Sequence, residues 1–386
     1  MNHSLRVIIS SGGVFHAYHA ARGAQRAGCL KRFIIGIYDR REQGIDPARM
    51  RKILWPNYIG QAIQYLPFAN NQPFSYLIRD NLFDLAARRH VTDCDIFHGW
   101  NHFSLFSLRK ARRLGARVII ERSSAHPVVQ DAILREEYVR FGLRYPAGNR
   151  LLFRKHLMEY EEADAITVSS EFVARTMREQ GVPSNKLVLT PLGFDPGRFR
   201  PAPKQDDVFR VLFVGSISLQ KGVPYLLEAF RKLALPNAEL VLAGGAFPDS
   251  RVFLPGYKGV YRHQPFVPQA DLPQIYNSAS VFVLPSLQDG FGMVVCEAAA
   301  CGVPVIITEN VGAVIRDGQD GFVVPIRDSD ALADRLLRLY EDPNLRRSMG
   351  ESARSYVQQF TWEAHSEKLI EAYRRIAAGE EAVRAG

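Results

Sequence analysis

Short apolar, β-branched runs alternate with segments of helical periodicity along the whole chain of 386 residues. A strand, a helix and a second strand in that order form a crossover, which places helices on both faces of a parallel sheet. We therefore predict an α/β fold with doubly wound parallel sheets. The predicted strands lie at residues 5–10, 33–37, 96–97, 117–120 and 165–168 in the first half, and at residues 209–214, 238–243, 281–284 and 303–307 in the second.

A proline- and glycine-rich segment divides this alternation into two parts. Residues 191–203 contain four prolines and two glycines, a composition typical of a linker. A chain of this length is also too long for one ordinary core. We predict two Rossmann-like domains, residues 1–196 and 197–360, with ligands at the carboxyl ends of their strands. A helix capped by Thr361 is expected in residues 361–386.

The composition indicates a soluble globular protein, with 47% hydrophobic and 23% charged residues. The apolar runs have the length of strands, far short of the ~20 residues that span a bilayer. The N-terminus lacks the apolar segment of a signal peptide, and the four cysteines form no C-x-x-C pair. We therefore expect a cytoplasmic protein with reduced thiols.

Charge is distributed unevenly along the chain. Residues 1–195 carry 28 Lys and Arg against 18 Asp and Glu, whereas residues 196–386 carry 21 against 22. A basic first half can attract an anionic substrate or an anionic membrane surface, so peripheral contact at the inner membrane face is a hypothesis. Nucleic acid is disfavoured because the arginine pairs at 88–89 and 112–113 have no interleaved aromatic residues.

The segment Asp289-Gly-Phe-Gly292 follows a predicted buried strand and precedes helix-forming residues 293–300, after which Gly302 can end the helix. Glycines and the free amides of a helix start bind an anion such as a diphosphate. Glu297, about one turn into the helix, can accept hydrogen bonds from two ribose hydroxyls, and Asp289 would point towards a group beyond the phosphates. On spacing alone, a tight turn with surface acids explains the pattern equally well.

A second predicted anion site makes a purely structural turn a less satisfactory explanation of the first segment. Gly215 follows the first strand of the second half, and Lys221-Gly222 comes six residues later, with Pro224 at the first turn of a helix. An ammonium group at a helix start can stabilise a departing diphosphate without a metal ion. Both segments together predict a nucleoside diphosphate that carries a sugar.

The two segments resemble the donor site of retaining glycosyltransferases of family 4, which have the GT-B fold. The likeness lies in Gly215…Lys221-Gly222 and in Asp289-Gly-Phe-Gly-x4-Glu-Ala-x-Ala-x-Gly-x-Pro-Val, with Pro285-Ser286 before it and residues 317–325 after it. It spans nearly the whole chain and is strongest in residues 210–326. The resemblance implies two domains that face a cleft, a C-terminal helix that completes the first domain, and a nucleotide-sugar donor held by the second. It implies no metal ion or other cofactor.

The resemblance also implies the site residues. In the E-x7-E motif of the family the first acid faces the donor sugar and the second binds ribose, and these positions are Asp289 and Glu297. A rim-loop histidine contacts the sugar in the family, and His126 has the more similar position; with Lys221 and Asp289 it forms the predicted catalytic set. The predicted donor-binding residues are Gly12, Gly13, Gly215, Ser216, Lys221, Gly244, Phe266, Asp289, Gly290, Phe291, Gly292, Met293, Val294 and Glu297.

Three residues of the first half are weaker candidates for acceptor or sugar contacts. His16 follows the first strand, and His98 and His126 both end strand-like runs, which places them at the rim where ligands bind. Arg122 can contribute a cation. A lone histidine after a strand is more often structural than functional, so both interpretations of His16 and His98 stay open.

Two departures from the family pattern bear on activity. The first acid of the motif is Asp289, one methylene shorter than the usual glutamate, and Ser216 stands where the family often has a basic residue. Either another cation compensates, or Lys221 and the amides of residues 290–294 carry more of the diphosphate charge.

The sequence therefore predicts a glycosyltransferase of the hexosyltransferase type. It would move a sugar with retention from a nucleoside diphosphate to an acceptor hydroxyl of a glycan or a lipid-linked acceptor, in cell-surface polysaccharide or glycolipid assembly. The alternatives are a nucleotide-sugar epimerase with the same architecture and a catalytically dead nucleotide-sugar-binding partner. An NAD-dependent dehydrogenase is disfavoured because no G-x-G-x-x-G follows the first strand.

Overall fold

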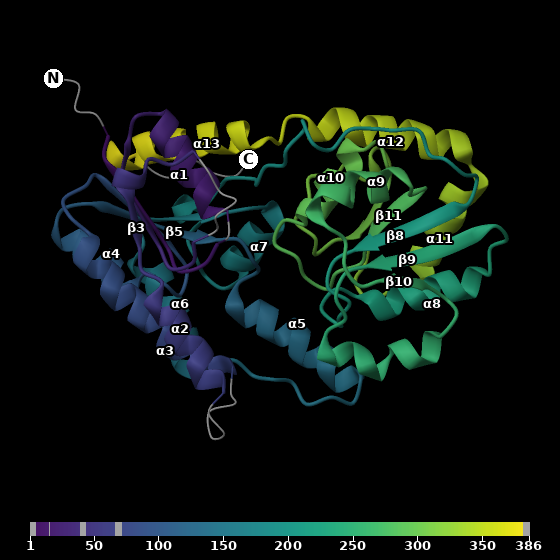
Figure 1. Cartoon of the computed structure of the whole chain (residues 1–386), viewed down its shortest axis with the longest axis horizontal. Helices are drawn as coiled ribbons and strands as arrows, with labels where there is room; N and C mark the ends of the chain where they lie inside the picture. Colours follow the sequence, from purple (N-terminus) through teal and green to yellow (C-terminus); the bar gives the residue numbers. More distant parts are fainter. Residues whose placement is uncertain (1–4, 15, 39–43, 66–71, 381–386) are drawn as a thin grey trace. The chain divides into compact units, whose positions relative to one another are not determined.

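The computed structural model describes residues 5–14, 16–38, 44–65 and 72–380, so the predicted end of the C-terminal helix at residues 381–386 lies outside the described residues. The chain divides into two compact units (Figure 1). Unit 1 comprises residues 1–123, 146–190 and 362–386, and unit 2 comprises residues 124–145 and 191–361. Unit 1 thus includes the C-terminal helix. Residues 124–145 fall within the predicted first domain, but in the structure they are part of unit 2.

Unit 1 is built on a seven-stranded parallel sheet with the strand order β3-β2-β1-β4-β5-β6-β7. Its strands are β1 (Val7–Ser11), β2 (Leu30–Ile35), β3 (Met50–Lys52), β4 (Ile96–Trp100), β5 (Arg117–Arg122), β6 (Ala165–Val168) and β7 (Leu187–Leu189). The central strands are buried along almost their whole length, because helices cover both faces of the sheet.

The helices of unit 1 form two layers. Figure 1 shows α1 and α13, which pack against each other, on one side of the sheet, and α3, α4 and α6 on the other. The helices are α1 (Ala17–Arg26), α2 (Trp55–Gln64), α3 (Gln72–Ala87), α4 (Leu105–Arg113), α6 (Arg150–Glu162), α7 (Glu171–Glu179) and α13 (Trp362–Ala377). The short 3-10 helices are η1 (Pro47–Arg49), η2 (Arg88–His90) and η3 (Ser184–Lys186).

Unit 2 repeats the same topology in a six-stranded parallel sheet of order β10-β9-β8-β11-β12-β13. Its strands are β8 (Phe209–Val214), β9 (Ala238–Ala243), β10 (Arg262–Gln264), β11 (Val281–Leu284), β12 (Val305–Thr308) and β13 (Gly321–Val324). Both units therefore have a Rossmann-like strand order, in which the direction of winding reverses between two central strands.

The helices of unit 2 also lie on both sides of its sheet, with α9, α10 and α12 on one side and α8 on the other (Figure 1). They are α5 (Pro127–Arg140), α8 (Val223–Leu233), α9 (Leu272–Asn277), α10 (Met293–Ala300), α11 (Ser329–Glu341) and α12 (Pro343–Val357). The 3-10 helices are η4 (Pro248–Val252), η5 (Leu254–Tyr257) and η6 (Gln269–Asp271).

Helix α5 is fixed to unit 2 by a buried carboxylate. Glu137 is completely buried and accepts hydrogen bonds from Tyr225 Oη at 2.8 Å and from Arg327 Nε at 2.7 Å. Arg327 adopts a φ of 63°, and its guanidinium also donates to the carbonyl of Ile133 at 3.1 Å. A buried charge requires such partners, so these contacts explain why α5 belongs with the second sheet.

Candidate active site

The candidate site lies where the winding of unit 2 reverses, between the neighbouring strands β8 and β11. The loop after β8 contains Gly215 and Lys221, and the loop after β11 contains Asp289 and Gly292. The carboxyl ends of adjacent parallel strands meet at one edge of a sheet, so residues 68 positions apart in sequence come together. The two predicted anion-binding segments therefore form one site.

A salt bridge joins these two loops. Lys221 Nζ lies 2.5 Å from Asp289 Oδ2, and both side chains are only partly exposed. The second carboxylate oxygen of Asp289, Oδ1, accepts a hydrogen bond from the amide of Gly292 at 3.0 Å. Asp289 therefore holds both the ammonium group and the turn at the start of α10.

The start of α10 offers amides to an anion. Gly292 adopts a left-handed φ of 67°, and the first residues of the helix, Met293 and Val294, are half-buried. Their amides have no acceptor within their own helix, since the first turn of a helix always lacks one. Phe291 is buried, so only its main chain can contact a ligand.

Two glycines allow the strand ends to approach each other closely. A Cβ on Gly222, whose φ is 64°, would lie 1.9 Å from the carbonyl oxygen of Pro285. A Cβ on Gly244, whose φ is 137°, would lie 2.0 Å from the carbonyl oxygen of Gly215. Any side chain at these positions would push the loops apart.

Glu297 lies in α10 and is mostly buried. Its Oε2 accepts a hydrogen bond from Tyr276 Oη at 2.7 Å. Burial raises the pKa of Glu297 to about 7, although the hydrogen bond from Tyr276 and the charge of Arg198 act in the opposite direction. Glu297 is thus poised to lose its proton near neutral pH when a hydroxyl donor arrives.

Neighbouring residues that the sequence did not single out position the two loops. Asp249 Oδ2 accepts from the amide of Leu219 at 3.1 Å and from Tyr138 Oη at 3.2 Å, and burial next to this carboxylate raises the pKa of Tyr138 to about 12. The amide of Asp289 donates to the carbonyl of Asn310 at 2.9 Å. No motif marks these residues, because their partners lie far away in sequence.

His126 caps the first turn of α5. Its Nδ1 accepts a hydrogen bond from the amide of Val128 at 3.3 Å, Pro127 follows at the first helical position, and the side chain is buried. His126 therefore belongs to the same unit as Lys221 and Asp289. The cap is a structural function, and contact with a donor sugar stays a prediction.

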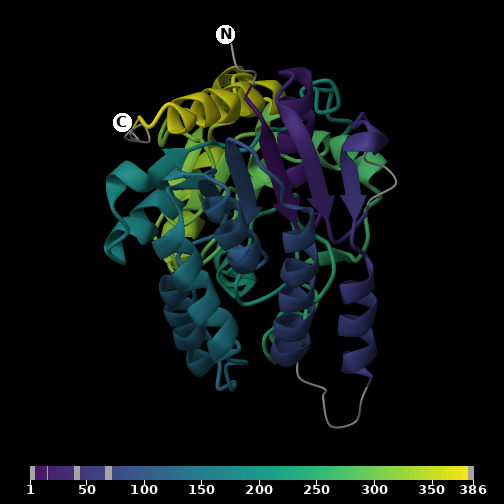
Figure 2. The same ribbon diagram turned by 90° about the vertical axis from the view of Figure 1, so that its left-hand side faces the viewer.

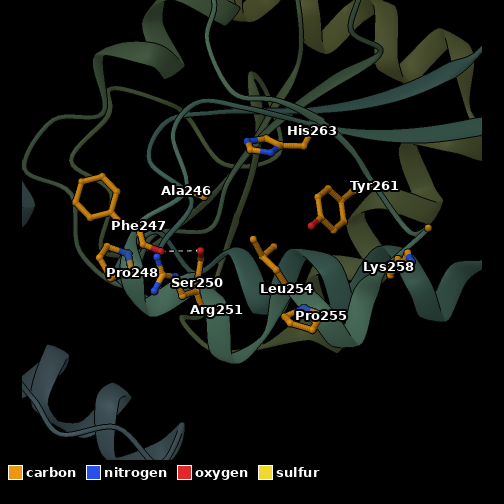
Figure 3. Close-up of a pocket in the computed structure, with 11 residues that line it drawn as sticks. Ala246, Phe247, Pro248, Ser250, Arg251, Leu254, Pro255, Lys258, Tyr261 and His263 are labelled. Atoms are coloured by element: carbon orange, nitrogen blue, oxygen red, sulfur yellow. Dashed lines mark hydrogen bonds between the residues drawn. The ribbon is translucent and has the colours of Figure 1, made fainter.

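Beside the Gly244–Gly245 turn, unit 2 has a pocket of about 650 Å³ (Figure 3). His263 and Tyr261 point into it from the region of β10, and Leu254 closes it from below in this view. The ring of His263 contacts the carbonyl of Gly244 at 2.9 Å. The predicted residues Gly244 and Phe266 are not among the lining residues, and Phe266 is 76% exposed.

In unit 1, His16 and His98 meet at a buried carboxylate. Glu121 Oε1 lies 3.2 Å from His16 Nε2, and Glu121 Oε2 lies 3.7 Å from His98 Nε2. Burial opposes the negative charge of Glu121, but the two imidazoles hold its pKa well below its usual range. Glu121 is the central residue of this cluster, a position that the sequence did not reveal.

The predicted position of His98 is wrong. His98 is the third residue of β4, which continues to Trp100, and it is completely buried. Its Nδ1 contacts Tyr373 Oη at 2.6 Å, and burial lowers its pKa. The strand runs on because Gly99 and Trp100 also fit a buried pleated sheet, so His98 lies in the core and not at the rim.

The other candidates of unit 1 lie near the ends of strands. Gly12 and Gly13 follow β1, and a Cβ on Gly12 would lie 2.1 Å from the Phe103 ring. Arg122 is the last residue of β5 and donates to Asn101 Oδ1 at 3.3 Å. These contacts explain the local geometry, and ligand binding by these residues stays a prediction.

Within the described part of the chain, no group of histidines, cysteines and acids is arranged to hold a metal ion. Nor does any helix among the described residues have the length and apolar character needed to cross a membrane.

The fold is shared with solved glycosyltransferases of the GT-B class. Sucrose-phosphate synthase from Thermosynechococcus elongatus superposes with a TM-score of 0.73 at 21% identity, over 97% of this chain and all of that one. HepE of Anabaena, solved in complex with UDP-glucose, superposes with a TM-score of 0.66 at 16% identity, over 95% of this chain and 98% of that one. Two Rossmann-like units of this kind define the class.

Sequence comparison identifies the family. Residues 10–198 match the model of Glycosyltransferase Family 4, and residues 197–356 match that of Glycosyl transferases group 1. An uncharacterized glycosyltransferase of Methanocaldococcus jannaschii is 27% identical over 95% of both chains. The chain therefore belongs to the family 4, group 1 glycosyltransferases, and it is an enzyme of that type.

Proposed function

We propose that this glycosyltransferase moves a sugar, with retention of configuration, from a nucleoside diphosphate to an acceptor hydroxyl. The process it serves would be cell-surface polysaccharide or glycolipid assembly. The observation that carries the proposal is the single site formed by Lys221, Asp289 and the start of α10, with Glu297 one turn further on. Each part of this site suits a different part of a nucleotide sugar.

The diphosphate would bind Lys221 and the amides of the first turn of α10. Lys221 already lies at this turn through its salt bridge with Asp289. As the bond to the sugar breaks, negative charge develops on the outer phosphate, and a fixed ammonium with oriented amides stabilises it. The site would then need no metal ion, and turnover should persist with a chelator present.

Glu297 would bind the ribose, as its carboxylate can accept two adjacent hydroxyls. Asp289 and His126 would orient the sugar. Both oxygens of Asp289 are already engaged, one by Lys221 and one by the amide of Gly292. A carboxylate held in this way is a poor nucleophile, which favours attack of the acceptor on the same face as the departing diphosphate.

The test is transfer from a panel of nucleotide sugars, with UDP-sugars first because HepE was solved with UDP-glucose. The readouts are nucleotide release and the anomeric configuration of the product by NMR. Lys221→Met and Glu297→Ala should each lower turnover at least about 10²-fold. The control is Lys232→Met, which removes an exposed lysine of α8.

Three outcomes would overturn the proposal. Unchanged rates in both site variants would refute the assigned residues. An isomerised donor formed without acceptor would identify an epimerase. Binding of nucleotide sugars without turnover over a broad acceptor panel would identify a catalytically inactive binding protein.

A further inference from the structure

Residues 53–78 form the longest stretch of the chain without Asp, Glu, Lys or Arg. Charged residues make up 23% of the sequence, so about six would be expected in 26 positions of average composition. Charge resumes at once on either side, with Arg51-Lys52 before the stretch and Arg79 after it. A charge-free sequence of this length is unusual in a protein that faces only water.

The outward face of α2, which belongs to this stretch, is apolar and aromatic. Trp55, Tyr58, Ile59, Ala62 and Tyr65 follow one another at the spacing of one helical face, and all five are exposed. Tyr58 is 65% exposed and Tyr65, the residue after the helix, is 88% exposed. In an ordinary surface helix this face would be polar.

The opposite face of α2 is already packed against α3. Figure 2 shows the two helices side by side, extending away from the sheet of unit 1. Ser75 Oγ donates to the carbonyl of Gly60 at 2.7 Å, and a Cβ on Gly60 would lie 3.1 Å from Arg79 Cβ. The aromatic face is therefore held outward by a packed helix pair.

Two basic residues closely precede this helix in the chain. Arg51 and Lys52, at the end of β3, are both exposed and lie just before α2. The Lys52 ammonium stacks over the Tyr38 ring at 3.4 Å from its centroid. Cations next to exposed Trp and Tyr side chains match the chemistry of a lipid headgroup layer. There, aromatic side chains lie at the boundary with the acyl chains, and basic side chains bind phosphates.

We propose that the exposed face of α2, defined by Trp55, Tyr58, Ile59 and Tyr65, docks the protein on an anionic bilayer surface. We favour a bilayer over a second protein chain because the exposed charged residues that closely precede this face in the chain, Arg51 and Lys52, are both cations and suit anionic headgroups. The aromatic side chains would supply the salt-resistant part of the binding, and Arg51 and Lys52 the salt-sensitive part.

The test uses the full chain without nucleotide, so that its failure is separate from a failure of the proposed reaction. Sedimentation with phosphatidylcholine vesicles containing phosphatidylglycerol is measured at low and high salt. The variant Trp55→Ser/Tyr58→Ser should lower the vesicle partition coefficient by about tenfold, at both salt concentrations. Arg51→Gln/Lys52→Gln should lower it at low salt only.

The matched control is Leu151→Ser, which removes an apolar side chain on α6 that is 64% exposed, close to the exposure of Tyr58. This variant should bind vesicles like the original protein. Equal binding by the Trp55/Tyr58 variant, or an equal loss in the control, would overturn the proposal. So would a dimer in solution that the Trp55/Tyr58 variant abolishes while vesicle binding is absent.

Discussion

Replacing Asp289 by asparagine should have opposite effects on nucleotide binding and on sugar transfer. In the structure its carboxylate holds the Lys221 ammonium at 2.5 Å and accepts a hydrogen bond from the amide of Gly292 at 3.0 Å. Asparagine keeps an oxygen for the amide but removes the negative charge beside the ammonium. The turn should therefore keep its shape while the site becomes more attractive to a diphosphate.

The size of the binding effect follows from the exposure of the pair. The side chains of Lys221 and Asp289 are 21% and 17% exposed, so water screens their interaction only in part. A partly exposed pair is worth about 1 kcal/mol, which equals about fivefold tighter binding of UDP. Transfer should fall about 10²-fold, because the charge-assisted contact to the sugar that we propose for Asp289 in the transition state would be lost.

Isothermal titration calorimetry with UDP and steady-state turnover measure the two effects. The control Asp328→Asn removes a carboxylate that caps the first turn of α11 in the same unit, and it should change neither quantity. Thermal unfolding of both variants shows that the fold is kept. Weaker UDP binding together with full turnover in Asp289→Asn would refute the reasoning.

Three further changes test the site and its support. The pKa of Glu297, about 7, implies an ionised fraction that rises with pH, so UDP affinity should increase about tenfold from about pH 6 to about pH 8, and Glu297→Gln should show no such rise by calorimetry. Gly222→Ala should cost about 3 kcal/mol or more in urea unfolding, because its Cβ would meet a carbonyl oxygen at 1.9 Å, whereas Gly245→Ala, with no atom within 4 Å, should stay within about 0.5 kcal/mol. Glu137→Gln should cost about 3 kcal/mol in the same assay, since Arg327, whose side chain is 13% exposed, loses the completely buried one of its two carboxylate partners. Glu136→Gln, on a side chain that is 53% exposed, should change stability by about 0.5 kcal/mol or less, and equal losses in the two glutamine variants would contradict the burial argument.

Most strands of the two sheets could be predicted from the sequence. The strands at 165–168, 209–214, 238–243 and 281–284 and the helix at 293–300 have the predicted bounds. These elements are buried over most of their length, so their apolar composition alone predicts them. The strands that were not predicted, β3, β7, β10 and β13, have only three or four residues each.

The sequence is sufficient to predict that Lys221 and Asp289 lie in the same site. Both follow predicted strands, and glycines mark the turns in which they lie. The sequence does not predict that α5 belongs to unit 2. It depends on Glu137, whose partners Tyr225 and Arg327 lie 88 and 190 positions away. From sequence alone, a carboxylate in a helix is predicted to be a surface residue, because the groups that neutralise it are known only from the fold.

The division of the chain also determines which fragments of the protein can fold on their own. The polypeptide passes from one unit to the other after residues 123, 145, 190 and 361. A fragment that begins at residue 191 would lack α5 and leave the Arg327 guanidinium without Glu137. Unit 2 can therefore be isolated intact only with residues 124–145, either fused to it or supplied as a separate peptide.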